Sequence, residues 1–370
     1  MKTVKLGEVT IKNSTIKWSA KDLSYEYIDL SSVDRDSYSI QKTMRITAKT
    51  APSRAQKIVK KDDVLFGTTR PTLDRRCVVG EKYDGQICST GLCVLRADKE
   101  RILPKYIYHL LSTQSFKDYI EQTQRGTSYP AVTDSDVKTF VFMLPSLEEQ
   151  RRVVVRLDAA FDKIDRAIEL TQKNIEDTRL LFDVSSSVIL GDKFEKNTKI
   201  SELIKLRSGD FLPRKSMQLN GKYAVVGGNG INGCHNLYNQ SGETITIGRV
   251  GEKCGNLHYY RDDIWVTDNA FFVSAYLQDT VKKYIFYALQ HVNLRSYAKH
   301  TAQPVISYSG IKNIKLYIPA PEAQMQAVTE MDRLIINIDG LSEQYMRKIK
   351  AFLGLKQSML SQAFFEGGVE

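Results

Sequence analysis

The sequence predicts an α+β protein made of two copies of one unit, in which a mixed α/β lobe is followed by a long helix. Three observations predict this fold: an internal repeat, two heptad stripes, and short β-like runs separated by glycine. The chain has 370 residues, of which 42% are hydrophobic, so it can bury the cores of two domains. We therefore expect two lobes in a pseudo-twofold repeat, joined by two long helices.

The repeat is clearest at two similar segments. At an offset of 174 residues, Leu144-Pro145-x-x-Glu148-x-Gln150 matches Ile318-Pro319-x-x-Glu322-x-Gln324, and Pro130 matches Pro304. These matches divide the chain into four predicted parts. They are a first lobe at residues 1–144, a spacer helix at 145–190, a second lobe at 191–318 and a C-terminal spacer helix at 319–370.

Each lobe is predicted to combine strands with one helix. In the first lobe, β-like runs cover residues 64–67, 77–79 and 92–95, and a helical pattern covers 104–122. In the second lobe, β-like runs cover residues 223–226, 244–247 and 270–275, and a helical pattern covers 280–297.

The segments after Pro145 and Pro319 are predicted helices, because a proline precedes each start and acidic residues crowd the first turn. Their apolar residues follow the 3,4 spacing of a coiled-coil seam. The seam residues are Val154, Leu157, Phe161, Ile164 and Ile168 in the first helix and Val328, Met331, Ile335 and Ile338 in the second. Helices of about 40 residues would each be about 60 Å long. Matching length and register predict that the two helices pack against each other as a coiled coil, with the lobes at opposite ends if the helices run antiparallel. Packing of each helix on its own lobe is the alternative.

The positive charge is confined to the lobes. The chain has a net charge of +10. Residues 1–144 contain 24 basic and 17 acidic residues and residues 191–318 contain 17 and 10, so each lobe carries +7, whereas each helical segment carries −2. Two equally basic lobes on a slightly acidic helical part favour two polyanion-binding modules, such as modules for nucleic acid.

Turn-rich segments of the lobes contain residue types that bind base edges and phosphates. Arginine can form two hydrogen bonds with guanine, and asparagine or glutamine can do so with adenine. The candidate DNA-binding residues are Arg70, Arg75, Arg76, Arg125, Thr127, Ser128 and Tyr129 in the first lobe, and Asn229, Asn232, Arg249, Lys253, Asn256, His300 and Gln303 in the second.

Several chemistries are not supported by any motif. Five cysteines without a C-x-x-C pair and five histidines without H-E-x-x-H predict neither a disulfide framework nor a metal site. Residues 228–233 match G-x-G-x-x-G, but a β-like segment follows instead of the helix that a dinucleotide site needs. Asp136-Val137-Lys138 has no acidic partner to complete a nuclease site. The sequence therefore predicts no catalytic site, metal or cofactor in this chain.

The sequence also contains no apolar stretch of about 18 residues and no apolar run near its start, which predicts a cytoplasmic protein without a membrane span. Three functions remain in view from the residues alone. They are a non-catalytic DNA-recognition scaffold, an enzyme that modifies or cuts DNA by itself, and a helical adaptor that binds RNA or protein.

The duplicated helix signature resembles that of a known family. Residues 144–158 lead into Phe161-x-x-Ile164-Asp165, the segment from Ile318 repeats the pattern, and SMLSQAFFEG closes the chain. This sequence resembles the specificity subunit of type I restriction-modification systems over essentially its whole length. The second signature differs from the first, with Ala323, Met325 and Gln326 where Glu149, Arg151 and Arg152 stand.

The resemblance implies a non-catalytic subunit that binds double-stranded DNA. Each lobe would recognise one half of a bipartite, asymmetric target, and the two helices, running antiparallel, would set the spacer between the halves. Two modification subunits, which bind S-adenosylmethionine and methylate adenine, would dock on the helices. Restriction and translocase subunits, which use ATP and Mg²⁺, would join that core.

Overall fold

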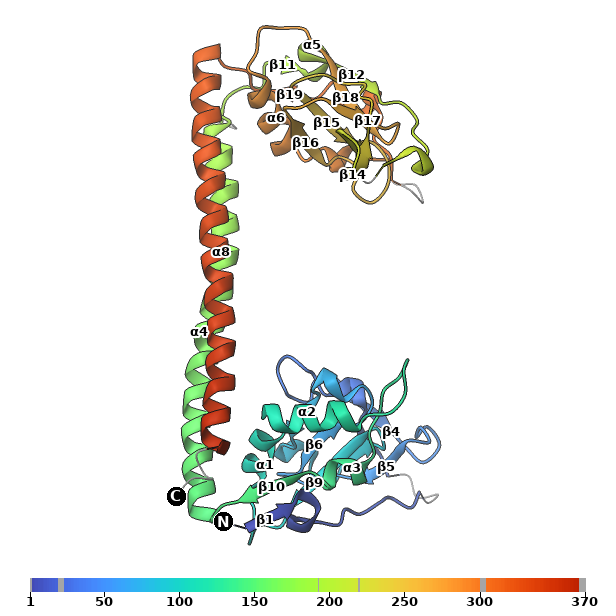
Figure 1. Ribbon diagram of the computed structural model, residues 1–370, viewed down its shortest axis with the longest axis vertical. Coiled ribbons are helices and arrows are strands. Elements are labelled where there is room, and N and C mark those ends of the chain that lie inside the picture. The colour runs from blue at the N-terminus through green and yellow to red at the C-terminus, as the bar shows by residue number, and fades with distance from the viewer. Residues whose placement is uncertain (1, 19–22, 192, 219, 300–303, 366–370) are drawn as a thin grey trace. The chain divides into compact units, whose positions relative to one another are not determined.

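The computed structural model describes residues 2–18, 23–191, 193–218, 220–299 and 304–365 (Figure 1). The chain forms two compact units. The first unit contains residues up to 171 and residues from 347 onward, and the second contains residues 172–346. Each unit therefore combines one lobe with part of each long helix.

The first lobe contains two four-stranded sheets and one two-stranded sheet. One sheet has the order β2-β9-β6-β7, another has the order β4-β3-β8-β5, and β1 pairs with β10. Its strands are β1 Lys2–Lys5, β2 Thr10–Ile11, β3 Tyr25–Ile28, β4 Met44–Ile46, β5 Ala55–Ile58, β6 Val64–Gly67, β7 Arg76–Val78, β8 Ile87–Ser89, β9 Leu92–Ala97 and β10 Val141–Leu144. Its helices are α1 Pro104–Leu110, α2 Gln114–Thr123 and α3 Asp134–Lys138.

The second lobe repeats this topology, except that its second sheet has three described strands and lacks a counterpart of β5. Its sheets have the orders β12-β18-β15-β16 and β14-β13-β17, and β11 pairs with β19. Its strands are β11 Thr198–Lys199, β12 Ile204–Ser208, β13 Tyr223–Gly227, β14 Gly230–His235, β15 Thr244–Gly248, β16 Leu257–Tyr260, β17 Ile264–Val266, β18 Ala270–Tyr276 and β19 Lys315–Leu316. Its helices are α5 Ile200–Leu203, α6 Lys282–His291 and α7 Tyr308–Ile311. The matching strand orders confirm the predicted duplication and the α+β class.

The prediction of one continuous helix in each lobe is wrong, because both helices are interrupted. In the first lobe, α1 ends at Leu110 and the Thr113 side chain caps a new helix by accepting a hydrogen bond from the Phe116 backbone nitrogen at 3.3 Å. In the second lobe, Asn293 adopts a left-handed conformation with φ 51° after α6, and a 3-10 turn, Leu294–Tyr297, follows. Such short polar side chains favour caps and turns over helix interiors.

The two long helices are α4 Leu147–Ile189 and α8 Pro321–Phe365. In the first unit, Leu157 near the start of α4 shares a core with Leu360 near the end of α8, and Lys356 pairs with Asp165. In the second unit, Phe182 near the end of α4 packs against the core that contains Met331 near the start of α8. The paired segments run in opposite directions in each unit, as predicted.

All nine predicted seam residues are buried or half-buried. Two polar interruptions of the first seam, Thr171 and Thr178, are also buried. Their hydroxyls donate to the carbonyl oxygens of Ala167 and Asn174, both at 2.6 Å, so neither polar group is left without a partner in the seam.

Candidate nucleic-acid interface

Each repeated glutamine joins a long helix to its own lobe. Gln150 is fully buried; its Oε1 accepts from the Leu103 backbone nitrogen at 2.8 Å and its Nε2 donates to the carbonyls of Arg101 (2.9 Å) and Pro145 (3.0 Å). Leu103 is the N-cap residue of α1, whose side chain offers no acceptor. The glutamine thus makes bonds to backbone groups that a helix start and a loop would otherwise leave unpaired.

Gln324 plays the same part in the second unit. Its Oε1 accepts from the backbone nitrogen of Val281, the N-cap residue of α6, and its Nε2 donates to the Pro319 carbonyl, both at 2.8 Å. Both glutamines belong to the repeated sequence signature, but the signature does not indicate their role in joining helix to lobe.

A repeated aspartate adds a second joint. Asp158 pairs with Lys105 and accepts from His109 Nε2 at 2.8 Å. Burial opposes ionisation of Asp158, but hydrogen bonds from Lys105 and His109 outweigh it and lower the pKa of the carboxyl. Burial lowers the pKa of His109, so this imidazole is neutral and donates through Nε2.

In the second unit, Asp332 accepts from Lys283 at 2.7 Å and from the Tyr287 hydroxyl. The first turns of each long helix therefore pack on their own lobe, as the alternative proposed, and the same turns also pack against the end of the other helix.

The first lobe brings two predicted DNA-binding segments together, residues 68–75 and 125–131, here called the first loop pair. The Arg70 backbone nitrogen donates to the Pro130 carbonyl at 2.7 Å, and Arg125 and Ala131 exchange two backbone hydrogen bonds of 2.9 Å. The Arg70 guanidinium lies 4.7 Å from the centre of the Tyr129 ring. Thr127, Ser128 and Tyr129 are exposed at the tip of this hairpin.

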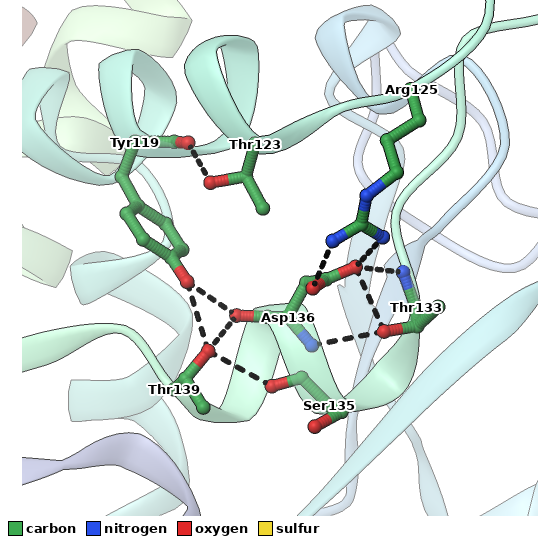
Figure 2. A network of polar contacts seen from close by, with 7 residues as sticks. All are labelled: Tyr119, Thr123, Arg125, Thr133, Ser135, Asp136 and Thr139. Atoms are coloured by element: carbon green, nitrogen blue, oxygen red, sulfur yellow. Dashed lines mark hydrogen bonds and ion pairs between the residues drawn. The ribbon is translucent and has the colours of Figure 1, made fainter.

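Arg125 is held at the base of the hairpin by Asp136 (Figure 2). The two terminal nitrogens of Arg125 lie 3.0 and 3.2 Å from the Asp136 carboxylate, which also accepts from the Thr133 backbone nitrogen at 2.8 Å. The Thr133 backbone bond and the Arg125 guanidinium lower the pKa of Asp136 to about 2. Asp136 is therefore a helix cap with an arginine partner, and its match to half of a nuclease site is a coincidence.

Arg76 is not available for DNA, which corrects that prediction. Its exposed fraction is only 6%, it pairs with Asp74, and its guanidinium lies 4.2 Å from the Tyr38 ring centre and 5.3 Å from that of Tyr108. A buried arginine needs such partners to offset its desolvation. Arg75 is half-buried and donates to the Val33 carbonyl.

The second lobe repeats the same backbone frame with residues 249–256, 299 and 304–306, here called the second loop pair. The Gly251 backbone nitrogen donates to the Pro304 carbonyl at 3.0 Å, and that of Lys299 donates to the Val305 carbonyl at 3.0 Å. Lys299 occupies the position of Arg125 at the 174-residue offset, a signal that the sequence analysis did not use. His300 and Gln303, predicted to bind DNA from this loop, lie outside the described residues.

The other predicted residues of the second lobe differ in exposure. Lys253 is exposed, whereas Arg249 is half-buried and donates to Ser208 Oγ at 2.9 Å and the Asp268 carbonyl at 3.2 Å. Asn232 is exposed on β14.

Asn229 and Asn256 are also exposed, and their side chains are hydrogen-bonded to each other at 3.1 Å. Asn229 lies in the turn of the β13-β14 hairpin, where Gly230 has φ 93°. Gly230 and Gly233 lie within strand β14 and do not precede a helix, so the dinucleotide-binding alternative is wrong.

Among the described residues, no group of three or more histidine, cysteine, aspartate or glutamate side chains is arranged to hold a metal ion. All five cysteines are free thiols. Burial raises the pKa of the Cys77 and Cys88 thiols to about 12, so both remain protonated at neutral pH. No helix within the described ranges is long and apolar enough to cross a membrane.

Comparison with known protein families identifies the family to which this architecture belongs. A family model described as the type I restriction modification DNA specificity domain matches residues 1–177 and 192–351. The chain belongs to this family. The resemblance inferred from the helix signatures is therefore confirmed.

Relatives in this family are similar over part of their length. The chain is 27% identical over 152 residues to the type I restriction enzyme EcoprrI specificity subunit of Escherichia coli, an alignment that covers 40% of this chain and 38% of that protein. It is 26% identical over 137 residues to the HindI specificity subunit of Haemophilus influenzae, which covers 36% of this chain and 30% of that protein. The alignments thus span well under half of either relative.

Solved structures share the fold over nearly the whole chain. A chain from a study of complex assembly and conformational transition of the type I R-M system superimposes with a TM-score of 0.87 at 24% identity, covering 98% of this chain and 97% of that one. The HsdS subunit from Thermoanaerobacter tengcongensis gives a TM-score of 0.64 at 25% identity, with 98% and 96% covered. Both confirm the predicted fold.

Proposed function

We propose that this chain is the specificity subunit of a type I restriction-modification system, in which each lobe recognises one half of a bipartite, asymmetric DNA duplex. The observation that carries the proposal is the recurrence of one loop-pair frame in two lobes. The backbone hydrogen bonds from Arg70 to Pro130 and from Gly251 to Pro304 are equivalent, while the side chains around them differ. Two equal frames with different side chains suit a target whose two halves differ.

Charge and family membership support a DNA ligand. Each lobe carries +7, and contacts between basic groups and phosphates provide most of the non-specific affinity for DNA. The chain itself is non-catalytic and selects the sequence on which its partners act. It holds no cofactor of its own and works in the cytoplasm.

The long helices set the spacer between the half-sites and bind two modification subunits, which supply S-adenosylmethionine and methylate adenine. Restriction and translocase subunits, with ATP and Mg²⁺, complete the enzyme. Large apolar side chains outside the seam, among them Leu170, Val184 and Ile336, are exposed and are available for this docking.

The test is to produce the chain with the modification subunits of its own system and to map methylated adenines across a host genome. We expect a split motif, with two short specified halves around a fixed run of unspecified bases. A contiguous or palindromic motif would contradict the two-lobe assignment. Methylation or cleavage by the purified chain alone would contradict the non-catalytic role.

A further inference from the structure

A polar cleft in the second lobe lies beside the residues that the sequence analysis singled out. It has a volume of about 790 Å³, and its lining includes Phe211, Arg214, Asn232 and the turn at residues 267–269. No motif marked Phe211 or Arg214, which lie in the connection between β12 and β13.

The connection that forms one wall is fixed at both ends. At its start, the Gly209 and Asp210 backbone nitrogens donate to the carbonyls of Ala270 (3.1 Å) and Val266 (3.0 Å). At its end, the Gln218 backbone nitrogen donates to the Cys234 carbonyl of β14 at 2.8 Å. Between these points Phe211 is 73% exposed, although it is a large apolar side chain. An aromatic ring exposed on a fixed segment suits a ligand contact.

The opposite wall is continuous with the second loop pair. A methyl group on Gly228 would lie 3.1 Å from the Asn269 carbonyl oxygen and 3.2 Å from that of Val250. One added to Gly227 would lie 2.1 Å from Asn232 Nδ2, so a side chain there would displace the asparagine. The glycines thus let the hairpin, the 267–269 turn and the second loop pair lie in direct contact.

One buried polar group on this side has no partner. Thr267 is 4% exposed, and within the described part of the chain its hydroxyl makes no hydrogen bond. A buried hydroxyl without a partner is costly unless a water or a ligand completes its bonding. Because this hydroxyl is itself buried, the groups that can contact a ligand are the more exposed lining side chains, among them Arg214 and Asn232.

The chemical groups that line the cleft indicate whether it suits the edges of bases or a phosphate. A phosphate site is built from cations and N–H or O–H donors, and a carboxylate would repel the ligand. This cleft instead combines the Arg214 guanidinium and the Asn232 and Asn269 amides with the Asp268 carboxylate. In the major groove, these groups match guanine, adenine and the cytosine amino group, and an aromatic ring can contact the thymine methyl group.

We propose that this cleft reads base edges of the half-site bound by the second lobe, with Arg214, Asn232 and Asp268 as specificity-determining residues. The inference rests on the proposed function, since it assumes that the lobe binds duplex DNA.

The test uses the complete complex with its modification subunits and compares adenine-methylation motifs for wild type, R214Q and the matched control K215Q. Lys215 is the adjacent exposed cation and does not line the cleft. For R214Q we expect roughly ten- to hundredfold weaker discrimination at one or two positions of a single half-site, with the other half unchanged. K215Q should leave the motif unchanged.

N232A is tested in the same way. If the wild type gives a split motif, and R214Q and N232A both give the same motif as the wild type, the cleft assignment is overturned. A loss of methylation at all sites alike would also overturn it, because that is the result for a phosphate contact. If R214Q assembles poorly, the isosteric D268N variant tests the cleft instead. We expect D268N to weaken base discrimination at one position of the same half-site. Absence of a split motif from the wild type would instead count against the proposed function itself.

Discussion

The two lobes differ most clearly at the base of their loop pairs. In the first lobe, Arg125 is held by Asp136; at the matching positions of the second lobe, 174 residues on, the chain has Lys299 and Gly310. The helix cap below them is nevertheless retained. Thr133 accepts from the Asp136 backbone nitrogen at 3.1 Å, and Ser307 accepts from that of Gly310 at 3.2 Å. Backbone hydrogen bonds and helix caps are thus the same in the two loop pairs, whereas the charged side chains differ between the two copies.

The joints between lobes and helices differ less. Both use a buried glutamine bonded to an N-cap nitrogen, and both use an aspartate, but the aromatic donor is His109 in the first unit and Tyr287 in the second. The comparison shows that the joint is shared, whereas one of its donors can titrate near neutral pH and the other cannot.

The largest expected effect comes from breaking the seam in either unit. Leu157 is fully buried and Met331 is its repeat counterpart, so L157D or M331D would bury a carboxylate without a partner. We expect each to cost about 4 kcal/mol or more of the free energy of unfolding. The two tryptophans, Trp18 and Trp265, lie one in each lobe, so denaturant unfolding of single-tryptophan variants measures the units separately.

The matched control for the seam is L170D, a substitution on the same helix at a residue that is 64% exposed. It should change the free energy of unfolding by no more than about 0.5 kcal/mol. If L157D were tolerated as well as L170D, the pairing of α4 with α8 would be wrong.

A smaller effect is expected from the glutamine joints. Q150A removes three hydrogen bonds to backbone atoms and Q324A removes two, so each should cost about 1–3 kcal/mol, with the greater loss for Q150A. Chemical denaturation of the full chain measures both. Q326A, at an exposed position of α8, is the control. Equal stability of Q150A and Q326A would show that the buried glutamine contributes nothing.

The smallest effect concerns pH and separates the two joints. Burial lowers the pKa of His109 in the folded chain, so the unfolded chain binds the proton first as pH falls below about 6.5. The stabilising contribution of His109 is therefore present above that pH and is lost on acidification. The difference in unfolding free energy between wild type and H109Q should shrink from pH 7.5 to 5.5. The difference between wild type and Y287F should stay constant, and a parallel change in both would refute the assignment.

The sequence was sufficient to predict the duplicated architecture because its signals are local and periodic. The seam from Val154 to Ile168 and the repeated Pro-x-x-Glu-x-Gln segments need no knowledge of distant contacts. The helix break at Thr113 was missed because the surrounding pattern stayed apolar and helical, and only the cap shows that the chain turns there.

The site was predicted less completely because its partners are distant in sequence. Arg76 looked like a surface arginine, and its burial depends on Tyr38 and Tyr108, 38 and 32 residues away. The glutamine joint depends on a backbone nitrogen 47 residues upstream, which no side-chain pattern can reveal. The exposure of loop residues such as Thr127 and Ser128 follows from local turn residues, and their role in DNA binding stays a prediction.

The glutamine joint also has an evolutionary consequence. Gln150 and Gln324 bond to main-chain atoms of their lobes, and these atoms are present whatever side chains the lobe carries. Mutations can therefore alter most of a lobe's surface without disturbing its attachment to the helix. The surface of one lobe can therefore change by mutation without a matching change in the other lobe or in the long helices.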